Sequence, residues 1–183
     1  MRVLCIFGSH QWQASDEWAS RRCKNCQIVQ VQYYDNELGS RWEERRLTEL
    51  ATRFVEAGKA PSTMRSIHCS LDYQKLDSLP PQIGHATRLI TLNLFGNQLT
   101  SLPGEIGKLK VLRTLNVGSN RLTSLPGEIG QLTTLERLLL SGNQLTSLPR
   151  QIGKLKALEW LDLGGNQLTS LPRQIGELTS LKR

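Results

Sequence analysis

No apolar run in this sequence approaches the about 20 residues that a membrane-spanning helix needs. The opening stretch, MRVLCIFGSHQW, has one basic residue and a short apolar segment. That segment is too short for a signal-peptide core, and no small-residue cleavage site follows it. The sequence therefore predicts no membrane association and a cytoplasmic location. In that compartment the four cysteines are expected to be thiols or metal ligands rather than disulfides.

Aromatic side chains are also scarce, with four tryptophans, three tyrosines and three phenylalanines among 183 residues. The formal net charge is +7, but the basic residues are spread out, with small clusters such as Lys108/Lys110 and Lys154/Lys156. The sequence has no basic helix and no basic stretch interleaved with aromatics, which are the patterns typical of nucleic-acid-binding surfaces. The charge therefore favours a solvated surface, and nucleic-acid binding is the alternative.

One eight-residue motif, GNQLTSLP or SNRLTSLP, occurs four times in the second half of the chain. Alignment on its asparagine gives units of 23 residues, and a fifth unit, TSLPRQIGELTSLKR, stops with the chain. The aligned asparagines are Asn97, Asn120, Asn143 and Asn166. A fixed period in the range of about 20–29 residues, with the pattern L-x-x-L-x-L-x-x-N-x-L, predicts leucine-rich repeats. The expected fold is an α/β solenoid with short parallel strands on its concave face.

Within one unit the residues alternate as they do in a β-strand. In LRTLNVGSN, Leu115 and Val117 alternate with Thr114, Asn116 and Gly118. One set is expected to point into the solenoid and the other to line its open, concave face. A further pair of apolar residues, Leu112 and Leu122, is expected to complete the inward ring.

The asparagine of each unit lies where the chain turns away from the strand. Its amide both donates and accepts, so Asn120 is expected to satisfy backbone groups of the bend and of the neighbouring coil. The LP..IG segment is expected to return along the convex side, where proline stiffens the turn and glycine permits unusual backbone angles. Because one unit cannot bury its own leucines, the units must stack.

The repeat begins before the clear copies. The stretch SIHCSLDYQKL at 66–76 aligns one period before LITLNLFGNQL, with Gln74 in place of the asparagine. Cys69 and Leu71 then occupy inward positions. Cys69 is therefore expected to be a small core residue, and a reactive or metal-binding thiol is the alternative.

This half of the chain resembles bacterial leucine-rich-repeat proteins of the 23-residue type, with the pattern LTSLPxxIGxLxxLxxLxLxxNxL. The resemblance covers residues 66–183 and departs from the pattern at Ala86, where other units carry leucine, and in the degenerate first unit. It implies a solenoid that binds other macromolecules, usually proteins, and that is not an enzyme. The enzymatic alternative is an effector of ubiquitin-ligase type, but such proteins need a separate catalytic domain for which the sequence leaves no length.

The strand columns predict which side chains face the concave side. Most positions carry small or polar residues, as a solvated sheet face would. The exceptions are large or charged, and Trp and Arg are common binding anchors. The alternative is that the tryptophan only shields a leucine beside it from water. The predicted partner-binding residues are Phe95, Arg137, Leu139, Trp160 and Asp162.

The first 65 residues do not repeat, and they contain the other three cysteines. Cys5, His10, Cys23 and Cys26 give the spacing C-x4-H-x12-C-x2-C, and zinc commonly takes four N/S ligands that include one C-x-x-C pair. Strand-like runs, RVLCIF and QIVQVQYY, flank this set. Residues 1–36 are therefore predicted to form a zinc-ribbon-like hairpin unit with a structural zinc ion. The alternatives are idle thiols or a redox pair, and a redox pair would need a strand–helix context that is missing here.

The same stretch resembles short phage-type zinc-binding proteins that begin CxxFGHxW and later carry CxxC. The match covers about 25 residues and departs by the inserted Ser9 and by Gln27, where glycine is usual. All four ligands would come from the protein, which leaves no open position for hydrolysis and favours a structural role.

Two further segments flank the repeats. Residues 40–58 predict one amphipathic helix, because Ser40 and Glu43 make a capping box and Gly58 follows an apolar stripe. This helix is expected to cap the solenoid's N-terminal end, and partner binding is the alternative. At the other end no polar capping unit follows Leu181, so the last leucines are expected to be partly exposed and to invite self-association.

Together these patterns predict a non-enzymatic protein–protein interaction module with a structural zinc site at its N-terminus. The alternative is a nucleic-acid-binding or effector-type adaptor protein that uses the zinc unit as a second recognition element. Its basic residues would be Arg21, Arg22 and Lys24, which lie beside the predicted metal site in the sequence.

Overall fold

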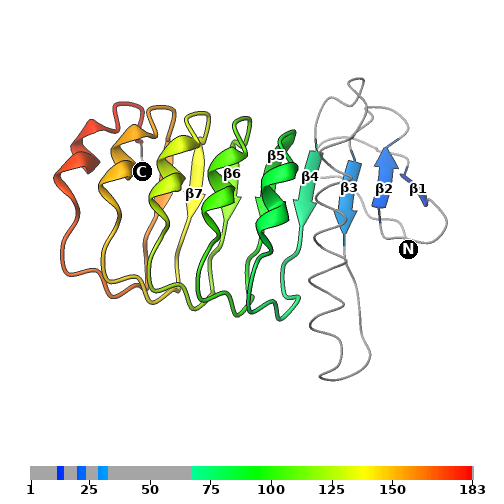
Figure 1. Ribbon diagram of the computed structural model, residues 1–183, viewed down its shortest axis with the longest axis horizontal. Coiled ribbons are helices and arrows are strands. Elements are labelled where there is room, and N and C mark those ends of the chain that lie inside the picture. Colours follow the sequence, from blue (N-terminus) through cyan, green and yellow to red (C-terminus); the bar gives the residue numbers. More distant parts are fainter. Residues whose placement is uncertain (1–11, 15–19, 24–28, 33–66, 183) are drawn as a thin grey trace.

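The computed structural model describes residues 12–14, 20–23, 29–32 and 67–182 (Figure 1). Within these residues eight strands form one sheet in the order of the sequence, and five 3₁₀ helices follow strands β4 to β8 in alternation. The strands are β1 (Trp12–Ala14), β2 (Ser20–Cys23), β3 (Val29–Gln32), β4 (Ile67–Ser70), β5 (Leu89–Asn93), β6 (Thr114–Asn116), β7 (Arg137–Leu139) and β8 (Trp160–Asp162). The helices are η1 (Pro81–His85), η2 (Gly104–Lys108), η3 (Gly127–Gln131), η4 (Arg150–Lys154) and η5 (Arg173–Glu177). None of the described helices is long and apolar enough to cross a membrane.

Strands β4 to β8 are parallel and form the strand row of a solenoid, while the helices form a second row (Figure 1). Paired residues occupy the same position in successive repeats, as Thr114 pairs with Arg137 and Arg137 with Trp160. The predicted 23-residue period is therefore confirmed as the spacing that brings one strand beside the next.

The inward positions form a continuous apolar core. Leu112, Leu115, Val117 and Leu122 have no exposed surface, as their place in the pattern predicted. Cys69 is 6% exposed and packs in the same core, which confirms it as a core residue of the first, degenerate repeat. Ala86, which replaces a leucine of the pattern, is buried as well.

Each helix begins directly after the proline of an SLP sequence, and that proline has a φ between −65° and −69°. The glycine inside each helix was predicted to provide unusual backbone angles, and this prediction is wrong, because none of these helix glycines is among the described residues with a positive φ. Its real role is steric. A Cβ atom at Gly130 would lie 2.5 Å from the carbonyl oxygen of Gln151 in the next helix, so the missing side chain lets adjacent helices approach.

Positive φ values recur instead in the loop after each strand, one residue before the asparagine. Gly96, Gly142 and Gly165 have φ values of 68°, 67° and 64°. The same position is occupied by Tyr73 in the first repeat and by Ser119 in the third, with φ values of 55° and 52°. Glycine adopts this conformation without strain, whereas other residues pay a steric cost.

Replacing Ser119 with glycine is therefore expected to raise the free energy of unfolding by about 0.5–1 kcal/mol, because relief of strain exceeds the added flexibility of the unfolded chain. Urea denaturation followed by circular dichroism measures this change. The matched control is Ser141→Gly, since Ser141 is not among the residues with positive φ. That control is expected to lower stability, and an equal gain from both changes would contradict the strain argument.

The N-terminal strands extend the same sheet. β1, β2 and β3 are antiparallel neighbours, and β3 then pairs in parallel with β4, so that Gln30 lies beside His68 in the register. The predicted strand in QIVQVQYY is present as β3, and Cys23, the first cysteine of the C-x-x-C pair, is the last residue of β2. The run RVLCIF and the predicted helix at 40–58 lie outside the described residues.

The C-terminal end of the solenoid exposes apolar side chains, as the sequence predicted. Leu171 and Leu181 are 50% and 37% exposed. The backbone hydrogen bonds between successive repeats continue there, since the Lys182 amide donates to the Glu159 carbonyl at 2.8 Å.

Candidate functional site

The outward side chains of β4 to β8, with those of the two residues after each strand, form one surface, which we call the sheet face. The register places its residues in columns across the strands, as the aligned units predicted. The first column is His68, Thr91, Thr114, Arg137 and Trp160, and the second is Ser70, Asn93, Asn116, Leu139 and Asp162.

The middle of the sheet face is polar and bonded within itself. The Asn93 side chain donates to the Ser70 hydroxyl at 3.2 Å and accepts from the Phe95 amide at 3.2 Å. Asn116 likewise accepts from the Gly118 amide at 3.1 Å. These side chains hold the loop after each strand, so part of their hydrogen-bonding capacity is used inside the protein.

Asp162 occupies the same column and has the same role. Its carboxylate accepts from the Gly164 amide at 3.0 Å, two residues along the chain. Asn93, Asn116 and Asp162 thus each accept a hydrogen bond from the backbone amide two residues further along the chain. Asp162 therefore has a structural function that its sequence position alone did not indicate, and a partner-binding role for it stays a prediction.

Three of the predicted anchors lie together at the C-terminal side of the sheet face. Arg137 pairs with Trp160 in the register, and Leu139 follows Arg137 on the same strand with its side chain on the same face. Arg137 is exposed, Leu139 is half-buried, and Trp160 is 39% exposed. We call these three residues the anchor cluster: one guanidinium beside two large apolar side chains.

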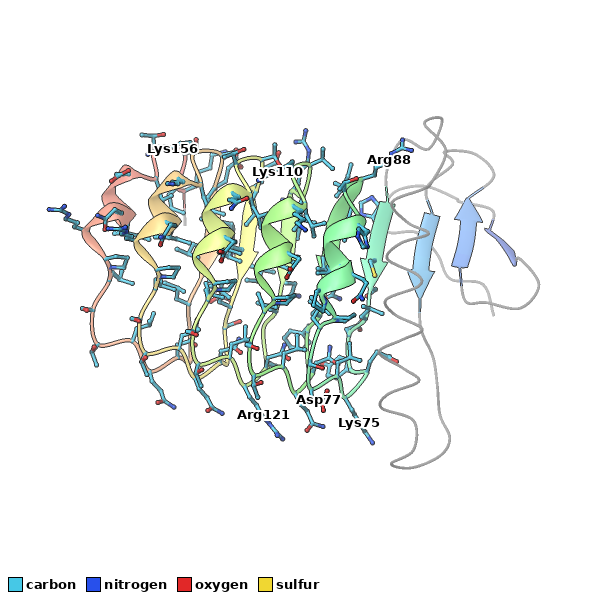
Figure 2. The ribbon with its side chains drawn as sticks, in the orientation of Figure 1. Lys75, Asp77, Arg88, Lys110, Arg121 and Lys156 are labelled. Carbon is cyan, nitrogen blue, oxygen red and sulfur yellow. The ribbon has the colours of Figure 1, made fainter. Side chains whose placement is uncertain are left out.

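The acidic residues that flank the anchor cluster in sequence are engaged by other cations. Glu136 forms an ion pair with Arg113, and Glu159 forms one with Lys182 at 3.0 Å. Lys110 and Lys156 lie at one rim of the solenoid and Arg121 lies at the other (Figure 2), while Glu105, Glu128 and Arg150 lie in helices. The described solenoid therefore carries most of its charge away from the sheet face.

A fourth predicted anchor, Phe95, lies apart from this cluster and contacts a residue that the sequence did not single out. Tyr73 meets Phe95 edge to face, with ring centroids 5.4 Å apart and an interplanar angle of 77°. Tyr73 is 68% exposed, and a Cβ atom at Gly96 would lie 2.6 Å from its ring. The aligned repeats could have drawn attention to Tyr73, because they place it where later repeats carry glycine or serine.

His68 begins the first column at the edge where β3 joins the solenoid. Burial lowers its pKa below the usual value of 6.5, since the charged imidazolium loses solvation there. Near neutral pH His68 is therefore the uncharged form and adds no positive charge to the sheet face.

The predicted zinc ligands are not brought together by anything that the structure describes. Cys5, His10 and Cys26 lie outside the described residues, and for Cys23 only its place at the end of β2 is described. Elsewhere in the described part of the chain, no three His, Cys, Asp or Glu side chains are grouped so that they could hold a metal ion.

Comparison with known proteins identifies the repeats. The leucine rich repeat family model matches residues 87–145, 110–168 and 133–183, which together span more than half of the chain. No curated protein matches the sequence.

The solved structures to which this chain is similar include the following three. A protein of Leptospira interrogans is 39% identical over 62% of this chain and 35% of its own, with a TM-score of 0.47. The ectodomain of the receptor kinase GASSHO1/SCHENGEN3 of Arabidopsis thaliana, solved with Casparian strip integrity factor 2, is 31% identical over 64% of this chain and 14% of its own, with a TM-score of 0.54. A chain of the BIR3–SERK2 complex of Arabidopsis thaliana is 32% identical over 58% of this chain and 60% of its own, with a TM-score of 0.51. This chain thus spans less than two thirds of the length of each of them.

Proposed function

This chain belongs to the leucine-rich repeat family, and from that premise we propose that it is a protein-binding module whose sheet face holds the partner. Leucine-rich repeats typically mediate protein–protein interactions and generally do so without catalysis. The observation that carries the proposal is the anchor cluster of Arg137, Leu139 and Trp160 on a sheet face whose other residues are mostly small and polar.

The composition of the anchor cluster supports this proposal. Large apolar and cationic side chains on the outside of a sheet gain little in the free protein, whereas Trp and Arg contribute most when a partner removes water from around them. The small side chains of Thr91, Thr114 and Asn116 leave the neighbouring strands accessible to a partner's backbone. The Tyr73–Phe95 pair supplies a second apolar contact on the same side of the solenoid.

Replacing Trp160 with alanine is expected to weaken partner binding about tenfold, a loss of about 1.4 kcal/mol, because the indole is the largest exposed apolar group of the cluster. Binders are selected from a displayed library of random peptides on the immobilised full chain, and the affinity of synthetic copies is measured by calorimetry. The matched control is Val111→Ala, since Val111 is apolar and 43% exposed but lies outside the sheet-face columns. Binders that tolerate Trp160→Ala but lose affinity with Val111→Ala would reject the sheet face.

We further propose that Cys5, His10, Cys23 and Cys26 hold one structural zinc ion in the N-terminal part. The described β2 and β3 support this proposal, because Arg22 pairs with Val29 in an antiparallel hairpin whose connection contains Cys26. A C-x-x-C pair at a hairpin turn is a common arrangement of two zinc ligands. The zinc would fix the hairpin that continues the solenoid's sheet.

Elemental analysis of the purified protein is expected to find about one zinc ion per chain, as four protein ligands imply. The double variant Cys23→Ser/Cys26→Ser is expected to contain none, because it lacks two of the four ligands. Cys69→Ala serves as the control, since Cys69 is a buried core residue, and it should retain zinc. Absence of zinc from freshly reduced wild-type protein would reject the site.

A further inference from the structure

We infer, resting on the proposed function, that the partner presents a carboxylate to Arg137, beside an apolar side chain that packs against Leu139 and Trp160. The expected ligand is therefore a protein segment that carries an Asp or Glu next to a large apolar residue.

Within the described residues, Arg137 forms no ion pair with an acidic side chain. Two neighbouring carboxylates pair with other cations, Glu136 with Arg113 and Glu159 with Lys182. Asp162 accepts from the Gly164 amide and forms no ion pair with Arg137. The guanidinium is thus an uncompensated donor on the sheet face.

The Arg137 guanidinium lies near two large apolar side chains of the sheet face. Trp160 lies one strand away, about 4.8 Å across the sheet, and Leu139 lies two residues along the strand, about 7 Å away. A partner that covers these two side chains excludes water from Arg137. Charge-assisted hydrogen bonds to a carboxylate are stronger than neutral ones, and they strengthen further where water is excluded.

The charges of the sheet face favour a protein carboxylate over the phosphates of a nucleic acid. Among the outward residues of β4 to β8, Arg137 is the one permanent cation, since burial keeps the pKa of His68 low. Asp162 adds a negative charge to the same surface. Nucleic-acid binding depends on several phosphate contacts made together, which a single arginine does not provide.

The test uses binders selected from the random-peptide library on the full chain. We expect the selected sequences to contain Asp or Glu beside a large apolar residue, and replacement of that Asp or Glu with its amide to weaken binding about tenfold. Arg137→Glu in the protein is expected to weaken binding by tenfold or more. The control with the same change in net charge is Arg121→Glu, at the rim of the solenoid (Figure 2), which should change affinity less than twofold.

The results that would contradict the carboxylate alone differ from those that would contradict the proposed function as well. Binders without an acidic residue that depend on Trp160 but not on Arg137 would overturn this inference and leave the proposed function standing. Binders that depend on neither residue, or no binders at all, would contradict both. Tighter binding of a single-stranded oligonucleotide than of any peptide, abolished by Arg137→Glu, would overturn the carboxylate in favour of a phosphate.

Discussion

Replacing Asn143 with leucine is expected to lower the free energy of unfolding by about 2–4 kcal/mol, because the buried side-chain amide bonds three backbone groups. Its oxygen accepts from the Leu122 amide at 3.0 Å. Its nitrogen donates to the carbonyls of Val117 and Leu140, both at 2.9 Å. Leucine fills a similar volume and makes none of these bonds.

The three backbone groups are not affected equally. The Val117 carbonyl also accepts from Asn120, and the Leu140 carbonyl also accepts from Asn166. Each carbonyl therefore keeps one donor when Asn143 is replaced. The Leu122 amide is left without its acceptor in a buried environment, and this orphaned donor accounts for most of the expected cost.

Urea denaturation followed by circular dichroism measures the effect of Asn143→Leu. The control is Gln144→Leu, because Gln144 is the exposed next residue and its side chain makes no hydrogen bond to another described residue. Asn166→Leu should cost less than Asn143→Leu, since Asn166 makes the same contacts in a partly exposed setting. Equal losses for Gln144→Leu and Asn143→Leu would show that the asparagine ladder is not what stabilises the stack.

Replacing Gly130 with alanine is expected to lower the free energy of unfolding by about 2–3 kcal/mol, as overpacking of a close contact does. The added Cβ would lie 2.5 Å from the Gln151 carbonyl oxygen and 2.8 Å from the Gln151 Cβ. Because the first of these atoms is backbone, relief requires helix η4 to move away from η3.

The chain offers a matched control at the same position of the last repeat. A Cβ atom at Gly176 would meet no atom within 4 Å. Gly176→Ala should therefore be neutral or stabilise by up to about 1 kcal/mol, because alanine reduces the freedom of the unfolded chain. Thermal and urea denaturation compare the two variants, and destabilisation by both would mean that glycine is needed for its backbone and not for the close approach.

The sequence predicted the stacking of the repeats correctly because each repeat obeys the same local rule. The alternation around Leu115 distinguishes inward from outward side chains, and the 23-residue period shows which residues are neighbours on adjacent strands. The pairing of Arg137 with Trp160 could therefore be predicted from the sequence. The structural role of Asn120 also followed from its position and from the donors and acceptors of its amide.

What the sequence did not predict depends on distances between repeats. The glycine inside each of helices η1 to η4 is needed because the next helix passes within contact distance, and no property of one repeat reveals that approach. Tyr73 was missed because its importance arises from a contact with Phe95 in the following repeat. The hydrogen bond that the Asp162 carboxylate accepts from the Gly164 amide was likewise not predictable from the place of Asp162 among the outward residues.

The most direct test of the sheet face as the binding surface is site-specific photo-crosslinking with a selected peptide. A benzophenone-bearing amino acid replaces Trp160 in one preparation and Lys154, the last residue of η4, in another. The binding proposal predicts a crosslink to the peptide from position 160 and none from position 154. A crosslink from position 154 without one from position 160 would place the partner on the helix row and contradict the proposal.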